Sequence, residues 1–256
     1  MTRVVIIGDG ALAGGLMMEL SERGANTSSG PDSGAVSLVQ QWARRTHTPE
    51  QLAAADLYIL AVSDGAIPEV SETLPFSPGS VVAHAAGSVD VAALSEKIAH
   101  RAVMWPLQTF TRGRRIADPR HTPFFIEGTT PHALHTVRTV AETLSDRVTE
   151  MPSERRARLH LAAAFAGNFS NAMLSLSEEI AVGADQTFDI LRPLVAETFA
   201  KALALPSPRD AQSGPARRGD RTTMARHRAI LAATAPHLAT LYDEISTQIW
   251  NISKKN

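Results

Sequence analysis

The chain has 256 residues, a formal net charge of -1 and no cysteine. Its length predicts one large domain or two modest ones, and 44% hydrophobic with 20% charged residues is typical of a globular protein. The near-neutral charge argues against a nucleic-acid partner, and the lack of cysteine excludes disulfides and thiolate chemistry. No apolar run approaches the roughly 18 residues needed to span a bilayer. We therefore expect no membrane partner and a cytoplasmic protein, since a strand begins too early for a signal peptide.

The first half of the chain alternates strand-like and helix-like segments. Strands are predicted over residues 4–7, 36–42, 57–62, 81–83, 102–105 and 124–126, and helices over 11–23, 66–74, 91–99 and 131–144. This alternation predicts an α/β fold, a Rossmann domain with a doubly wound parallel sheet over residues 1–151. A polar loop over 24–34 and the short stretch after the second strand predict a reduced or absent second crossover helix.

The second half, residues 152–256, contains only helical patterns. They cover residues 153–182, 188–203, 222–233 and 236–252. They predict an all-α C-terminal domain of residues 152–256. Apolar helices at 159–176 and 191–205 could bury their faces in the chain's own core or against a second copy, and a homodimer through this domain is expected.

A dinucleotide-binding pattern, Gly-x-Gly-x-x-Ala, follows the first strand at Gly8, Gly10 and Ala13. Gly8 permits the tight turn, Gly10 lets the backbone approach the phosphates, and Ala13 allows close helix packing. The start of the helix, with Ala11 and Leu12, offers free N–H groups to the pyrophosphate. The alternative is a glycine turn that binds no cofactor.

The end of the second strand indicates which cofactor is bound. NAD-binding proteins usually carry an acidic residue there for the ribose, whereas this chain has Arg44 and Arg45, which suit a 2′-phosphate. We therefore expect NADP ahead of NAD or F420-linked chemistry. The alternatives are a solvated arginine pair, and Asp32 as the ribose ligand.

Polar residues follow the third, fourth and fifth strands, where ligands bind in open α/β sheets. Further cofactor contacts are expected from Val62, Ser63, Asp64, His84, Gly87 and Ser88, and a catalytic role from Gln108. Ser88 and Asp90 could instead cap a helix, and His84 could be a buried structural histidine.

Seven strings carry a family resemblance: residues 56–64 (DLYILAVSD), 84–88 (HAAGS), 106–110 (PLQTF), 153–155 (SER), 160–163 (HLAA), 165–171 (FAGNFSN) and 214–220 (GPARRGD). Together they resemble the Rossmann-like proteins with a C-terminal DUF2520 domain, over nearly the whole chain. The resemblance implies a place among 6-phosphogluconate dehydrogenase-like enzymes, a superfamily that includes β-hydroxyacid dehydrogenases, ketopantoate reductases, pyrroline-5-carboxylate reductases and F420-dependent NADP reductases. It also implies a C-terminal domain like that of 6-phosphogluconate dehydrogenase.

In the related β-hydroxyacid dehydrogenases, the first helix of the second domain carries a catalytic lysine and, one turn later, an asparagine. Here His160 stands where the lysine would fall and Ala164 stands in the asparagine position, so the pair is absent. His160 could act as general acid or base. Asn168 is a second catalytic candidate and Asn171 a substrate contact, although along an α-helix they lie about 12 Å and about 16 Å from His160. All three could instead be polar residues of helix–helix contacts.

The loop over residues 212–220 carries a further candidate for substrate binding. Arg217 and Arg218 could clamp a substrate carboxylate, or could simply be solvated. Asp220 is expected to cap the helix that follows.

The leading hypothesis is an NADP-dependent oxidoreductase. It would transfer hydride to or from a small 2-oxo or hydroxy acid, ketopantoate-like for example, or an imine, bound between the two domains. His160 would donate the proton, with Asn168 and Gln108 positioning the substrate. The alternatives are a non-catalytic dinucleotide-binding sensor or scaffold, and a fold that has lost its cofactor. No metal site is expected.

Overall fold

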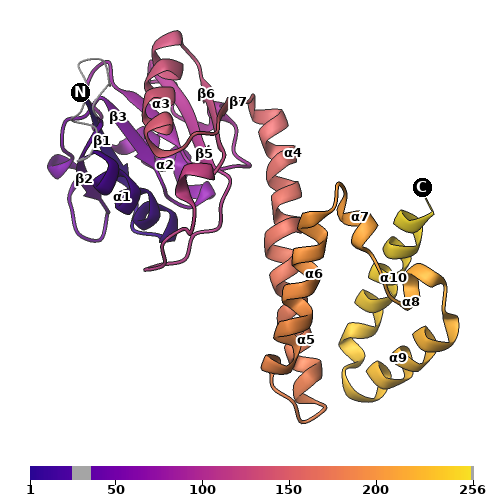
Figure 1. The fold of residues 1–256 in the computed structure, drawn as a ribbon. Helices are drawn as coiled ribbons and strands as arrows, with labels where there is room; N and C mark the ends of the chain where they lie inside the picture. The colour runs from indigo at the N-terminus through magenta and orange to yellow at the C-terminus, as the bar shows by residue number, and fades with distance from the viewer. Residues whose placement is uncertain (25–35, 255–256) are drawn as a thin grey trace. The chain divides into compact units, whose positions relative to one another are not determined.

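The computed structural model describes residues 1–24 and 36–254, which form two compact units, Met1–Asn168 and Phe169–Asn256 (Figure 1). The polar loop predicted over residues 24–34, with Asp32, lies outside the described residues except for its first. The predicted domain boundary after residue 151 falls one residue beyond the last strand, which ends at Glu150. Contacts in the structure group the next helix with the sheet, so the compact units divide after Asn168 instead.

The first unit is built on one seven-stranded sheet in the order β2-β1-β3-β4-β5-β6-β7. Its strands are β1 (Thr2–Ile7), β2 (Val36–Trp42), β3 (Leu57–Leu60), β4 (Val81–His84), β5 (His100–Pro106), β6 (Phe124–Gly128) and β7 (Val148–Glu150). Strands β1 to β5 are parallel, which confirms the predicted doubly wound α/β fold. The chain runs from β1 to β2 on one side and then to β3 on the other, so the strand order reverses at β1.

The sixth strand departs from the all-parallel expectation. β6 pairs antiparallel with β5, from Ala102 opposite Gly128 to Pro106 opposite Phe124. The helical structure of residues 107–123 is limited to one 3₁₀ turn, η4 (Pro119–His121), so the chain returns without a crossover helix. β7, which the sequence patterns did not predict, then pairs parallel with β6 after the helix α3 (Pro131–Leu144).

Alternating side chains of the strands build two cores. On one face, Val4 and Ile6 pack with residues of α1 (Ala11–Gly24) and α3. On the other, Val5 and Ile7 pack with Ile67 of α2 (Ile67–Thr73). All four strand residues are fully buried. This two-sided burial explains why the strand reads as a continuous apolar run.

Two connections on the second face are shorter than ordinary crossover helices. Between β2 and β3 there is only the 3₁₀ turn η1 (Pro49–Gln51), as the sequence predicted. The helix predicted over residues 91–99 is wrong, because only η3 (Val91–Ala93) forms. Leu94 then turns to extended backbone and is buried, and the Ser95 N–H donates to the Ser71 hydroxyl at 2.9 Å. These contacts favour a single turn over a continued helix.

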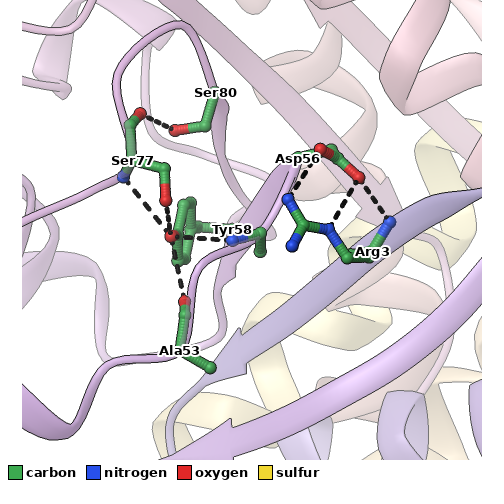
Figure 2. Close-up of polar contacts among 7 residues, drawn as sticks. Arg3, Ala53, Asp56, Tyr58, Ser77 and Ser80 are labelled. Carbon is green, nitrogen blue, oxygen red and sulfur yellow. Dashed lines mark hydrogen bonds and ion pairs between the residues drawn. The ribbon is translucent and has the colours of Figure 1, made fainter.

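Polar contacts fasten the amino-terminal end of the sheet, opposite the strand ends that carry the predicted site (Figure 2). The Tyr58 hydroxyl donates to the Ala53 carbonyl at 3.0 Å and lies 2.8 Å from the Ser77 hydroxyl. The Arg3 N–H donates to the Asp56 carboxylate at 2.8 Å, and this bond lowers the pKa of Asp56. Both contacts anchor the entry to β3.

The remaining elements are helical, as predicted. They are α4 (Ser153–Ala163), the π-helix η5 (Ala164–Phe169), α5 (Ser170–Val182), η6 (Phe188–Leu191), α6 (Arg192–Ala204), α7 (Pro208–Ala211), α8 (Pro215–Arg218), α9 (Arg221–Thr234), η7 (Pro236–Leu238) and α10 (Ala239–Ser253). The second unit has its own small core around Leu231 and Leu238. Within the described residues, no helix is long and apolar enough to cross a membrane.

Candidate functional site

The glycine turn after β1 occupies the point where the strand order reverses. Gly8 has a φ of +139°, and a Cβ at this position would lie 2.3 Å from the Ala61 carbonyl oxygen. Gly8 is thus required by the turn itself. Gly10 differs, because a Cβ there would meet no described atom within 4 Å. The backbone before α1 therefore faces open space, where a pyrophosphate could approach the first N–H groups of the helix.

The helix after the turn packs as the motif requires. Ala13 is fully buried in the core between α1 and the sheet. The Gly14 N–H donates to the Gly10 carbonyl at 3.0 Å, which starts the helical ladder. Ala11 and Leu12, the other two predicted contacts, lie in the first turn of α1. This geometry fits the phosphate end of a dinucleotide.

A cleft of about 460 Å³ opens beside the turn, at the carboxyl ends of β1, β2 and β3. Its lining includes four residues predicted to bind the cofactor: Gly8, Arg44, Arg45 and Val62. Arg44 is 3.0 Å from Glu69 and Arg45 is 3.8 Å from Asp9, and both arginine side chains are more than four-fifths exposed. Exposed ion pairs of this kind contribute little to folding stability. Either guanidinium could therefore exchange its partner for a phosphate in the cleft.

A hydrogen bond joins the loops that follow β3 and β4. The Ser88 hydroxyl donates to the Asp64 carboxylate at 2.8 Å. Ser63 precedes the 3₁₀ turn η2 (Asp64–Ala66) and makes no side-chain cap bond. The cap after β4 is Asp90, whose carboxylate accepts from the Ala92 N–H at 2.8 Å. Ser88 is therefore no cap, and with Asp64 it borders the carboxyl end of the sheet, where their contact with a cofactor stays a prediction.

His84, at the end of β4, is fully buried. Its Nδ1 accepts from the Ala86 N–H, and its Nε2 lies 3.3 Å from the Asp90 carbonyl oxygen, so the proton is assigned to Nε2. Burial above all, with the nearby Arg156 charge second, lowers the pKa of His84 to about 4. The neutral ring shapes the loop after β4. This geometry fits the alternative of a structural histidine, and direct cofactor contact stays a prediction.

A buried polar network ties α4 to the sheet. Arg156 is fully buried and lies 2.6 Å from the Glu127 carboxylate of β6. It also donates to the Val89 carbonyl at 2.5 Å and to the Ser153 hydroxyl at 2.9 Å. Ser153 in turn donates to Glu127 and accepts from the Val91 N–H. One charged cluster thus holds the loop after β4 and the start of α4 in register.

The three residues predicted to be catalytic, His160, Gln108 and Asn168, line one cavity of about 460 Å³ within the first unit. We call it the His160 cavity. Trp105 of β5 forms a wall, with its ring centroid 5.6 Å from that of His160 and the rings at 63°. Gly87 faces the same pair, because a Cβ there would lie 2.5 Å from His160 Cδ2. The loop after β4, the end of β5 and α4 therefore meet at His160.

The helix between His160 and Asn168 does not continue as an α-helix. Residues Ala164–Phe169 wind as a π-helix, a local distortion often found at functional sites. Gln108 Oε1 accepts from the Thr109 N–H at 2.8 Å, which orients its amide beside the cavity. His160 and Asn168 can therefore contact different parts of one ligand in this cavity.

The three predicted substrate residues lie in the second unit. Asn171 is exposed in the first turn of α5, and Arg217 and Arg218 are exposed in the one-turn helix α8. Arg217 donates to the Gln212 carbonyl. Their role in substrate binding stays a prediction. Asp220 caps α9 as predicted, accepting from the Thr223 N–H at 3.0 Å, and this bond lowers the pKa of Asp220.

Sequence reasoning missed the segment that follows β5. Arg112 donates to the Asp9 carbonyl inside the glycine turn at 2.8 Å, and Arg114 lines a cavity with Gln108 and Thr109. The signal was present, since three arginines fall within residues 112–115, in the loop that follows a predicted strand. In the part of the chain that the structure describes, no group of three or more histidines and carboxylates could hold a metal ion.

Sequence comparison identifies a family. Residues 122–249 match the model described as Domain of unknown function (DUF2520). No curated protein matches the chain.

Among solved structures, the chain is similar to a putative NADP oxidoreductase from Bacteroides fragilis, with 30% identity, 98% of each chain covered and a TM-score of 0.83. Protein TM1727 from Thermotoga maritima is 20% identical over 98% of each chain, with a TM-score of 0.71. A reductive aminase from Aspergillus terreus, in complex with NADPH and ethyl levulinate, is 14% identical over 99% of this chain and 98% of its own, with a TM-score of 0.60.

The two more distant structures show the fold alone, which is shared with an NADPH-bound reductase. The family rests on the match over residues 122–249 and on the 30% identity across nearly the full length. By these two findings, the chain belongs to the DUF2520 family.

Proposed function

We propose that this protein is an NADP-dependent oxidoreductase that transfers hydride to a small 2-oxo acid or imine, or from the corresponding hydroxy acid. One observation carries the proposal: His160, Gln108 and Asn168 line one cavity, and the same unit holds the glycine turn and its two arginines. A reductase needs both parts, one to hold a dinucleotide and one to manage a proton. The similarity to the NADP oxidoreductase fold supports the same reading.

The cofactor would supply hydride from its nicotinamide ring. The chain's own residues would do the rest. Gly8 and Gly10 would let the pyrophosphate approach the start of α1, and Arg44 and Arg45 would hold the 2′-phosphate.

The substrate end would be managed by the His160 cavity. His160 would give its proton to the oxygen or nitrogen that gains charge when hydride reaches the adjoining carbon, and would recover a proton from solvent. Gln108 and Asn168 would orient the reacting group by hydrogen bonds. Trp105, only 7% exposed, would keep water from one wall of the cavity.

The test separates binding from turnover. We expect wild-type protein to bind NADPH in a calorimetric titration and to oxidise it with at least one member of a panel of 2-oxo acids and imines. His160→Asn should keep the NADPH affinity and lose turnover by about 100-fold or more, the range of a general acid. His135→Asn, an exposed histidine on α3, is the matched control and should behave as wild type.

Two results would decide against the proposal. Tight NADPH binding with no turnover on the panel favours a non-catalytic sensor or scaffold, the alternative suggested by the missing lysine–asparagine pair. No binding at millimolar NADPH favours a fold that has lost its cofactor.

The preference for NADP has its own test. Arg44→Gln and Arg45→Gln should each weaken NADPH by about tenfold and leave NADH affinity nearly unchanged, because only NADPH carries the 2′-phosphate. Equal losses of affinity for NADPH and NADH would show that the arginines do not bind the 2′-phosphate.

We also propose that two copies of the chain pair through α5 and α6. On α6, Phe199 is 41% exposed and Leu203, one turn later on the same face, is 85% exposed, and on α5 Val182 is 63% exposed. Exposed large apolar side chains that share a helix face are typical of interfaces. Phe199→Glu with Leu203→Glu should convert a dimer to a monomer in light scattering. Ile230→Glu, an exposed residue of α9, is the control, and a wild-type monomer would disprove the pairing.

A further inference from the structure

The segment between β5 and β6 carries an arginine that the proposed function does not use. Residues 111–114 form a tight turn in which the Arg114 N–H donates to the Thr111 carbonyl at 3.0 Å, and Gly113 adopts a φ of +74°. Thr111 and Arg114 also pair as an isolated β-bridge. The turn therefore has a defined backbone, and its side chains are presented from a built loop.

The turn packs against the start of α1, where the proposed function places the cofactor phosphates. Arg112 donates to the Asp9 carbonyl at 2.8 Å. A Cβ on Gly15 would lie 2.4 Å from the Phe110 ring, so the segment packs closely on the first turns of the helix. These contacts place the segment beside the glycine turn.

Arg114 lines a cavity of about 360 Å³ together with Gln108, Thr109 and Thr111. Gln108 and Thr109 also line the His160 cavity, so the two cavities share a wall. An anionic group held by Arg114 would thus lie beside Gln108 and Thr109, two residues that also border the proposed reaction site.

The other charged groups of this cavity already have partners. Arg115 pairs with Glu22, and Asp118 lies 2.7 Å from His121, a contact that lowers the pKa of Asp118. Among the described residues, no carboxylate pairs with Arg114. The Arg114 guanidinium, with its five N–H donors, is therefore the charged group of this cavity that is left to bind a ligand.

We propose that Arg114 binds the acid group of a small carboxylate substrate, with the hydroxyl group of Thr111 as a further donor. The proposal rests on the proposed function, since it names the substrate class of the same site. A guanidinium binds a carboxylate by two parallel hydrogen bonds, which fixes orientation as well as charge.

The test compares pyruvate with pyruvamide, which carries the same ketone but no charge, by NMR titration of the full chain. Wild-type protein should bind pyruvate in the millimolar range and pyruvamide about tenfold more weakly. Arg114→Gln should weaken pyruvate by about tenfold and leave pyruvamide unchanged, and Arg114→Lys should restore part of the loss because it keeps the charge without the fork. Arg138→Gln, an arginine of α3 paired with Glu150, is the control.

NADPH affinity distinguishes the two anions that could use this arginine. Unchanged NADPH affinity in Arg114→Gln supports a substrate site, whereas a loss confined to NADPH assigns Arg114 to the cofactor phosphates and overturns the proposal. Undetectable pyruvate binding, or binding that Arg114→Gln does not weaken, also overturns it. If pyruvate binding depends on Arg114 but the wild-type chain does not bind NADPH, the acid site stands and the reductase function fails.

Discussion

Arg156 and Glu127 form an ion pair 2.6 Å long in which the arginine side chain is fully buried and the carboxylate side chain is 20% exposed. The pair joins α4 to β6, and through the Val89 carbonyl it reaches the loop after β4. Charges taken from water are costly, so such a pair need not add net stability. Its value here is positional, because the elements it joins carry Gly87 and His160.

Removing one partner of this pair should be strongly destabilising. Arg156→Met leaves the Glu127 carboxylate without its buried partner and should cost about 3 kcal/mol of unfolding free energy in urea titrations. Arg156→Met combined with Glu127→Gln should recover part of that loss, because no uncompensated charge remains. A single-variant loss within error of zero, or strictly additive losses, would show that the pair does not act as a unit.

The buried His84 should make stability depend on pH. The pKa of His84 is lowered in the folded state from 6.5 to about 4, so between these values the unfolded chain binds more protons. Stability is then highest above pH 6.5 and falls as the pH drops toward 4. The contribution of this group should decline by about 2 kcal/mol between pH 7 and pH 5.

A variant isolates this contribution from those of the carboxylates. His84→Asn can still accept from the Ala86 N–H through its amide oxygen but does not titrate. Urea unfolding at pH 7 and pH 5 should show a smaller difference in the variant than in wild type. An identical pH dependence would mean that His84 is protonated in the fold or plays no part in acid sensitivity.

Two glycines of the turn after β1 should respond differently to alanine. Gly8→Ala places a Cβ 2.3 Å from a backbone oxygen at a φ of +139°, so it should lower the melting temperature and abolish NADPH binding. Gly10→Ala enters open space and should leave the melting temperature unchanged, but it should weaken NADPH by about tenfold if the pyrophosphate occupies that space. Unchanged NADPH affinity in Gly10→Ala would place the cofactor elsewhere.

Local sequence patterns predicted the helices and strands that depend mainly on residues close together in the chain. The run Val4–Ile7 and the glycines after it predict β1 and its turn, and the periodicity of 131–144 predicts α3 with the bounds that the structure has. The false helix over 91–99 has a physical cause: Leu94 is buried by a turn and not by a helical face, and apolar spacing alone cannot distinguish the two.

The packing around the His160 cavity could not be predicted from a single sequence. His160 and Gln108 could be named as candidates from their places after predicted elements. That Gly87 and Trp105 meet His160 depends on the packing of elements 55 to 73 residues apart, which no local pattern encodes. Arg114 had a signal in the basic run after β5, but only the shared cavity wall connects it to His160.

Gly87→Ala should disturb the proposed proton donor without unfolding the protein. A Cβ there would lie 2.5 Å from His160 Cδ2 and 2.6 Å from Trp105 Cε2, and both obstacles are side chains that can move. The melting temperature should therefore fall little, while turnover in the reductase assay should fall by about tenfold or more, since small misplacements of a reacting group are costly.

Two measurements make this last prediction independent of the substrate. Because the Trp105 ring lies 5.6 Å from the ring of His160, the variant should change both the tryptophan emission and the His160 ring-proton shifts in NMR spectra. Gly167→Ala is the matched control for the two spectroscopic signals: it borders the same cavity, but its Cβ would lie 3.8 Å from Thr109 Cγ2, an ordinary contact, so emission and shifts should stay near wild type. Unaltered His160 signals in Gly87→Ala would show that His160 does not pack against the loop that carries Gly87. The position beside Trp105 would then not be the one in which His160 donates its proton.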